Sequence, residues 1–245
     1  MTAPSMAQTL QIVGGDLKTI GPDEAISALC WWLDAGVDVA IQESPRNWLK
    51  PTPKADPVKI DSPNIRIPDP QSLDALKDWL ATGADIPLAK GAGRRALPHG
   101  PEHAEVMLLC EAPGGNDGER PIGGAAWQLT ERMLAAIGFT TEQAYSASLS
   151  CVHVPGKKMS ASERDLCAEI ARRHIRLAAP KRLLLLGDGP CQALLGKPLA
   201  NARGQVHKIE GVRSVATFHP RHLVQRPLDK SLAWRDLLLL MEESP

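Results

Sequence analysis

Short apolar segments that end at glycine or proline turns alternate with helical patterns through the second half of the chain, and this alternation restricts the possible folds. Apolar runs of this length are typical of strands that are buried on both faces of a parallel sheet. A helix between successive strands makes a βαβ unit. We therefore expect an α/β domain with a mainly parallel, four-stranded sheet, its candidate strands being 105–111 (EVMLLCE), 144–152, 182–186 (RLLLL) and 212–218 (VRSVATF).

Four segments carry helical signals. Ser72 is placed to cap a helix over 73–82, and Ser160 followed by Glu163 has the spacing of a capping box. The expected helices are 73–82, 125–137, 160 to about 178, and 234–241.

The first 70 residues have a different composition. Residues 23–40 have apolar positions at helical spacing, with Asp23 and Glu24 in the first turn, where the helix dipole favours negative charge. Residues 44–70 contain seven prolines, which remove too many backbone donors for a long helix or an interior strand. We predict an N-terminal extension over 1–70, with a helix at about 23–40 and an extended linker at 44–70, followed by a single domain over 71–245.

Composition excludes several classes of protein. Of the 245 residues, 43% are hydrophobic and 23% are charged, which excludes a wholly disordered chain. No apolar run approaches the roughly 20 residues that cross a bilayer, and the N-terminus lacks a secretory signal pattern. The five cysteines lie at scattered spacings that do not indicate a disulfide framework, so we expect a cytoplasmic protein without a membrane partner.

The net charge of zero conceals an uneven distribution. Residues 153–235 carry 16 Lys and Arg against 6 Asp and Glu, whereas residues 1–152 carry 12 against 19. A basic C-terminal half suits a polyanionic partner. A solvated surface gives the same counts, so the charges alone leave both interpretations open.

Two polar residues follow predicted strands directly. Glu111 precedes a Pro-Gly turn, and His219 precedes a proline. The carboxyl ends of parallel strands meet at one edge of a sheet, so both residues are expected at the same crevice. A glutamate there could orient or deprotonate a water, and an imidazole could donate to an oxygen that gains negative charge. A structural carboxylate and a turn histidine bonded to backbone are the alternatives.

The order of the short motifs resembles that of a known family. The motifs are Glu111-Ala112-Pro113-Gly114, Ala179-Pro180-Lys181, Arg203-Gly204, Thr217-Phe218-His219-Pro220 and Trp234-Arg235-Asp236-Leu237. Together they resemble the uracil-DNA glycosylase superfamily, and within it the iron–sulfur branch called family four. The resemblance covers about residues 80 to 240.

This resemblance implies a three-layer α/β/α domain that hydrolyses the N-glycosidic bond of uracil, or a related deaminated base, flipped out of DNA during base excision repair. It implies that Glu111 stabilises the sugar cation and orients water, and that His219 stabilises the departing base. Base contacts would come from Ala112, Pro113 and Gly114. DNA contacts would come from Lys157, Lys158, Arg203, Pro220, Arg221 and His222, and the expected partner is DNA, bound by a monomer.

Two departures from the family pattern concern the base. The family places a Pro-Phe pair where this chain has Pro121-Ile122, and Ile122 offers less stacking than a ring. The family's uracil-reading Asn corresponds to Ala147 without gaps, or to Ser148 with a shift of one residue. A non-catalytic DNA-binding member of the same fold is therefore the alternative, and a small-molecule hydrolase or nucleotide-binding enzyme is a third reading.

A further departure concerns the cluster. The family's four cysteines correspond to Gly83, Ile86, Cys151 and Cys167, so two thiols are retained. A [4Fe–4S] cluster normally needs four thiolates. We expect no cofactor and interpret Cys151 and Cys167 as vestigial cluster positions.

Overall fold

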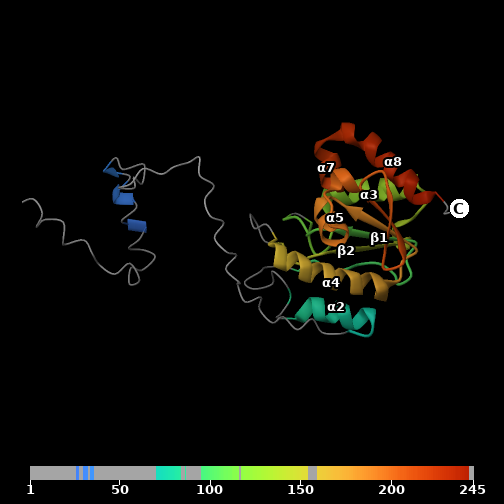
Figure 1. Cartoon of the computed structure of the whole chain (residues 1–245), viewed down its shortest axis with the longest axis horizontal. Helices are drawn as coiled ribbons and strands as arrows, with labels where there is room; N and C mark the ends of the chain where they lie inside the picture. Colours follow the sequence, from blue (N-terminus) through green and yellow to red (C-terminus); the bar gives the residue numbers. More distant parts are fainter. Residues whose placement is uncertain are drawn as a thin grey trace, which may run out of the picture. The chain divides into compact units, whose positions relative to one another are not determined.

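A computed structural model describes residues 26, 27, 30–32, 34, 35, 70–83, 86, 95–115, 117–153 and 159–242 (Figure 1). The chain divides into two units, Met1–Val58 and Lys59–Pro245. The predicted helix at 23–40 is described only in part, where residues 26, 27, 30–32 and 34 are helical. The proline-rich segment up to residue 69 lies outside the described residues. The domain boundary at residue 70 stays a prediction.

The sheet has five strands in the order β2-β1-β3-β5-β4. Four parallel strands match the candidates from the sequence: β1 (Val106–Cys110), β2 (Ala144–Ser148), β3 (Arg182–Leu186) and β5 (Val212–Thr217). The expectation of four strands was one short, because β4 (Val206–Ile209) pairs antiparallel with β5 at the edge. Two of its four residues are exposed, so its sequence lacks the apolar run that revealed the other strands.

Alternate residues of each strand pack on opposite faces of the sheet. On one face, Leu109 and Leu185 belong to the cluster that buries α2 (Leu73–Thr82), α4 (Ala161–Ala178) and α5 (Asp188–Leu195). On the other face, Leu108 and Leu184 pack with α3 (Gly124–Ala136) and α8 (Lys230–Met241). Each fully buried leucine contributes about 1.5–3 kcal/mol to folding. The predicted three-layer α/β/α architecture is confirmed, with α4 and α3 on opposite sides of the sheet in Figure 1.

The helix starts follow the predicted capping chemistry. Ser72 Oγ accepts from Ala75 N at 3.2 Å at the start of α2. Ser160 Oγ accepts from Glu163 N at 3.3 Å, and Glu163 accepts from Ser160 N at 2.9 Å, which completes the capping box of α4. The remaining short helices are η2 (Thr141–Gln143), α6 (Leu199–Ala202), α7 (Pro220–Gln225) and η3 (Pro227–Asp229). None of the described helices is long and apolar enough to cross a membrane.

The three central strands end at the same level of the sheet. Cys110 is paired with Leu186, and Leu186 with Thr217. The residues that follow each strand therefore emerge side by side at one edge of the sheet. They include Glu111 after β1 and His219 near the end of β5, so the register of the sheet brings together two residues that are far apart in the sequence.

Candidate active site

A cavity of about 550 Å³ lies at this edge of the sheet. Both Glu111 and His219 line it, as their positions after two central strands predict. Among the described residues no Phe, Tyr or Trp lines it. Its polar lining residues are Glu111, His153, Asp188, His219, Arg221, His222 and Gln225.

The imidazole of His219 is held in one tautomer. His219 is the N-cap of α7, and its Nδ1 accepts from the backbone N–H of Arg221 at 3.0 Å. The proton of the neutral ring must then be on Nε2. Nε2 is buried and has no hydrogen-bond partner among the described residues. A ring nitrogen without a partner at the wall of a cavity is a donor available to a ligand.

The same ring is kept neutral. Burial, and then the neighbouring positive charge of Arg221, lower the pKa of His219 to about 4, while Asp117 acts in the opposite direction. Desolvation disfavours the charged form of an imidazole. At neutral pH His219 is therefore an uncharged donor through Nε2.

Glu111 has room because α5 carries a glycine beside it. The side chain of Glu111 is exposed to the cavity. A Cβ on Gly189 would lie 2.5 Å from Glu111 Cγ, which is too close for any side chain. The backbone carbonyl of Glu111 accepts from Ser150 N at 3.0 Å. The carboxyl group lies beside the first turn of α5, where the helix dipole favours negative charge.

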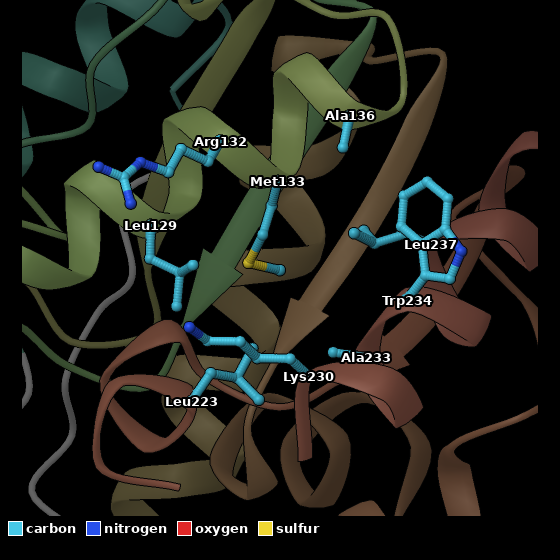
Figure 2. A pocket seen from close by; sticks show the side chains of 9 residues that line it. All are labelled: Leu129, Arg132, Met133, Ala136, Leu223, Lys230, Ala233, Trp234 and Leu237. Carbon is cyan, nitrogen blue, oxygen red and sulfur yellow. The ribbon is translucent and has the colours of Figure 1, made fainter. Parts of the chain in front are cut away.

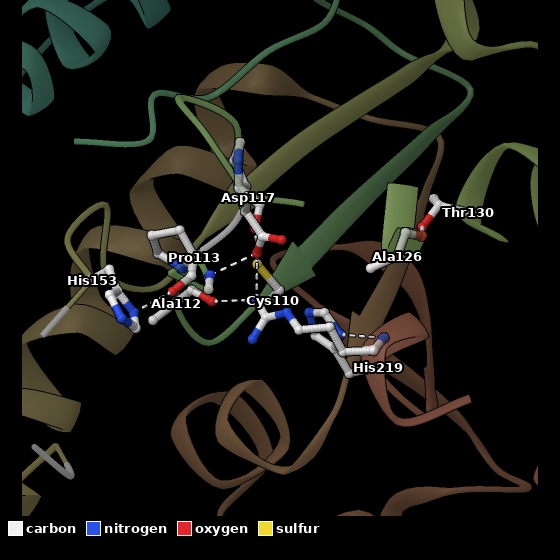
Figure 3. A network of polar contacts seen from close by, with 11 residues as sticks. Cys110, Ala112, Pro113, Asp117, Ala126, Thr130, His153 and His219 are labelled. Carbon is white, nitrogen blue, oxygen red and sulfur yellow. Dashed lines mark hydrogen bonds and ion pairs between the residues drawn. The ribbon is translucent and has the colours of Figure 1, made fainter. Parts of the chain in front are cut away.

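An arginine directly after one motif joins it to the loop that carries the other, and Figure 3 labels its two partners, Ala112 and Asp117. Arg221 donates from Nη2 to the carbonyl of Ala112 at 3.0 Å and to Asp117 Oδ2 at 2.7 Å. Asp117 Oδ2 also accepts from Gly114 N at 2.6 Å. Asp117 is nearly buried, with 5% of its side chain exposed. This network fixes the loop after β1 against the start of α7, and with it the spacing of the two candidate groups.

A second set of contacts supports the segment that carries His219. Asp236 of α8 is buried and accepts from Thr217 Oγ1 and from Arg203 Nε, both at 2.8 Å. The guanidinium of Arg203 lies over the Phe218 ring, 4.1 Å from its centroid. The other ring packed on Phe218 is that of His222, at a centroid distance of 4.9 Å. Phe218 is thus held next to His219 by charged and aromatic neighbours.

The structure brings part of the predicted base-binding set to the cavity. Ala112 and Pro113 line it. Gly114 does not, and its N–H is bonded to Asp117. The other three predicted residues are not among the described lining residues. Ile122 and Ala147 are almost fully buried, and Ser148 is the last residue of β2.

The predicted phosphate-binding residues are also divided. Arg221 and His222 line the cavity. Pro220 is buried in the first turn of α7, and Arg203 is paired with Asp236. The remaining two candidates, Lys157 and Lys158, lie outside the described residues.

Several lining residues were not predicted from the sequence. His153 follows β2 and is bonded from Nδ1 to the carbonyl of Pro113 at 2.9 Å. Asp188 begins α5, and its Oδ1 accepts from Leu199 N at 2.7 Å. The available signal was a titratable side chain soon after a predicted strand. That signal fitted His153 and Asp188 as well as it fitted Glu111, but neither residue belongs to a matched motif.

A second cavity, of about 190 Å³, lies between α3 and α8 (Figure 2). Its walls are mainly apolar, and Met133, Trp234 and Leu237 are among them. None of the candidate residues lines it. Its described lining residues include no Asp or Glu, and its two basic groups, Arg132 and Lys230, are at the ends of long flexible side chains. We therefore assign no chemistry to this cavity.

Comparison with known proteins decides the family. Residues 97–238 match the family model of the uracil DNA glycosylase superfamily. The chain belongs to this superfamily. It is also similar to a type-4 uracil-DNA glycosylase of Archaeoglobus fulgidus, with 28% identity over 142 residues, which cover 52% of this chain and 71% of that protein. The resemblance seen in the sequence is thereby confirmed at the level of the superfamily and of its family-four relatives.

The iron–sulfur branch of the superfamily raises the question of a cluster. Cys151 and Cys167 are buried, and burial raises the pKa of both thiols, that of Cys167 to about 12. The other two ligand positions are Gly83 and Ile86, which have no thiol. The guanidinium of Arg95 donates instead to the Gly83 carbonyl at 2.7 Å. Among the described residues no three His, Cys, Asp or Glu gather as a metal site, and the donors at these positions do not fit a four-thiolate cluster.

Proposed function

We propose that this protein is a DNA glycosylase that hydrolyses the N-glycosidic bond of uracil, or of a related deaminated base, flipped out of DNA. The observation that carries the proposal is the pairing of a carboxylate, Glu111, with an unpartnered buried donor, His219 Nε2, at one cavity. A cavity of about 550 Å³ is within the usual range for a small-molecule ligand and could admit a flipped base.

The two groups match the charges that develop as the bond breaks. When the bond from the sugar C1′ to the base nitrogen breaks, its electron pair leaves with the base, and the sugar becomes oxocarbenium-like. The Glu111 carboxylate stabilises this cation and orients a water, whose oxygen bonds to C1′ and whose proton passes to the carboxylate. His219 donates from Nε2 to a base oxygen that gains negative charge.

A neutral donor suits this task. Protonation of the His219 ring would place a hydrogen on Nδ1, but Nδ1 must remain an acceptor for the backbone N–H of Arg221. A neutral imidazole keeps its orientation and stabilises the anion without transferring its proton. Removal of one such preorganised donor typically lowers kcat by about 10²–10³-fold.

DNA is the proposed partner. The phosphate backbone would be bound by the basic span 153–235, with Arg221 and His222 at the cavity and with Lys157 and Lys158 as further basic residues of the span. We propose that residues 71–245 act as the glycosylase domain of a cytoplasmic monomer and that residues 1–70 are an extension.

One observation favours the alternative of a non-catalytic DNA-binding member. The described lining of the cavity has no Phe, Tyr or Trp, and the family's uracil-reading Asn corresponds to Ala147 without gaps or to Ser148 with a shift of one residue. Such a protein would bind DNA with strong salt dependence and would keep that binding after loss of Glu111.

A base-release assay tests the proposal. The full chain is incubated with single- and double-stranded oligonucleotides that contain uracil, hypoxanthine or xanthine. We expect release of at least one base, and a loss of a hundredfold or more in Glu111→Gln and in His219→Gln. His207→Gln is the matched control, because His207 is likewise bonded to a backbone group, the Ala202 carbonyl, but lies on β4 and is not among the described lining residues of the cavity. Absence of release from all three substrates would contradict the proposal.

A further inference from the structure

The loop after β2 brings a polar side chain to the cavity at a position that the matched motifs do not include. β2 ends at Ser148, and the described residues 149–153 that follow it include two that line the cavity, Val152 and His153. Of these, His153 is the polar one. The family's Asn corresponds to Ala147 or, with a shift of one residue, to Ser148: Ala147 is fully buried in the sheet, and neither residue is among the described lining residues. A base in the cavity would therefore meet His153 from this side.

The two ring nitrogens of His153 have defined hydrogen-bonding roles. Its Nδ1 lies 2.9 Å from the carbonyl oxygen of Pro113, and a carbonyl can only accept, so Nδ1 carries the proton (Figure 3). In the neutral ring Nε2 is then an acceptor. A Cβ on Gly115 would lie 3.4 Å from Nε2, so the glycine leaves this nitrogen uncovered on that side.

The cavity is thus lined by two imidazoles with opposite hydrogen-bonding roles. His219 presents a donor at Nε2, and His153 presents an acceptor at Nε2. Deaminated bases carry a ring N–H beside a carbonyl, as in uracil, hypoxanthine and xanthine. The corresponding ring nitrogens of cytosine and adenine carry no hydrogen and are acceptors. A cavity with one donor and one acceptor is complementary to uracil, hypoxanthine and xanthine. With cytosine or adenine, the lone pair of His153 Nε2 would face the lone pair of the ring nitrogen.

We propose that His153 Nε2 accepts a hydrogen bond from the ring N–H of the flipped base, and so selects uracil, hypoxanthine and xanthine over cytosine and adenine. This inference rests on the proposed function and names the residue that replaces the family's Asn in reading the base edge. An imidazole makes one contact where an amide makes two, and sites built on buried hydrogen bonds discriminate because the wrong base leaves a polar group unpaired.

Direct binding of free bases tests this proposal without catalysis. The full chain is titrated with uracil, with 3-methyluracil, in which a methyl group replaces the ring hydrogen, and with cytosine, and binding is followed by NMR. We expect uracil to bind about tenfold more tightly than either of the other two. His153→Leu should reduce this preference to less than threefold, and His153→Gln should restore part of it through its amide oxygen. His207→Leu is the matched control and should keep the wild-type preference.

The outcomes separate this proposal from the proposed function. If the wild-type chain binds uracil and 3-methyluracil equally, His153 does not read the ring N–H. The proposal also fails if His153→Leu keeps the wild-type preference, because the methyl group is then excluded by shape, and His153 only supports the Pro113 carbonyl. Failure of the proposed function has a different signature, which is the absence of base release while the His153-dependent preference persists.

Discussion

The backbone N–H of Arg221 donates to Nδ1 of His219 over 3.0 Å, and this bond decides which nitrogen of the ring carries the proton. The Arg221 side chain simultaneously bonds to Ala112 and Asp117. A single residue therefore orients the imidazole and fixes the loop that follows the carboxylate. The two halves of the site are coupled through Arg221 rather than through direct contact.

This coupling predicts the pH dependence of His219. Its pKa is lowered to about 4, below the ordinary value of 6.5, so the ring is neutral above about pH 4 and becomes charged only below it. We expect the NMR titration of the His219 ring protons in the full chain to show a midpoint well below 6. Arg221→Gln removes one of the two causes of the shift and should raise that midpoint. A wild-type midpoint near 6.5 would contradict the burial seen in the structure.

Stability should fall on acidification because of a second histidine. His174 is buried, its Nε2 is hydrogen-bonded to Tyr145 Oη at 2.8 Å, and burial lowers its pKa to about 3. Between about pH 6.5 and 3 the unfolded chain binds a proton that the folded chain does not, so the free energy of unfolding decreases as pH falls. One such group contributes a slope of up to about 1.4 kcal/mol per pH unit.

Urea denaturation at pH 7, 6 and 5 measures this slope. His174→Gln keeps an acceptor for Tyr145 but cannot be protonated, so its stability should depend less steeply on pH than that of the wild type. His219 contributes with the same sign in both proteins and cancels in the comparison. Parallel pH profiles for the two proteins would show that His174 does not titrate on unfolding.

Gly189→Ala should separate activity from stability. The new methyl group would lie 2.5 Å from Glu111 Cγ and would displace the carboxylate. Within a helix alanine is preferred to glycine by about 1 kcal/mol, which offsets part of the strain. We expect base release to fall by tenfold or more while the thermal midpoint changes little. In a Glu111→Gln background the same substitution should have no further effect on base release, and an additional loss there would argue against displacement of Glu111 as the cause.

Asp236→Asn should destabilise the fold. The carboxylate is 2% exposed and neutralises Arg203, whose side chain is 17% exposed. Removal of one partner from a buried ion pair typically costs about 3–5 kcal/mol, because the other charge remains without compensation. Asp165→Asn, on the exposed side of α4, is the control and should change the free energy of unfolding by less than about 0.5 kcal/mol. Equal stability of the two variants would show that Arg203 finds another acceptor.

Most of the fold could be predicted because the sequence patterns that indicate its strands and helices are local. The runs at 106–110 and 183–186 are apolar throughout, and the capping box at Ser160 marks the start of α4 directly. The edge strand β4 escaped prediction because His207 and Lys208 interrupt its apolar residues, and two of its four residues are exposed. The sequence therefore predicts the four parallel strands better than the antiparallel strand β4.

The site could be predicted only where a residue follows a strand within a recognisable motif. Glu111 and His219 satisfied both conditions, and the register of the sheet brings them to one cavity. His153 directly follows the predicted strand 144–152 but belongs to no matched motif, and β2 itself ends five residues before it. The pairing of Asp117 with Arg221 spans 104 residues of sequence, which no spacing rule covers.

The level at which β1, β3 and β5 end has a consequence for how such a chain can change over evolutionary time. Insertions in the connecting loops leave Cys110, Leu186 and Thr217 aligned, whereas deletion of a single residue within β1 or β5 would turn that strand's remaining side chains to the opposite layer and shift its terminus by about 3.3 Å. We therefore expect that natural variants of this protein tolerate length changes between the strands and not within them.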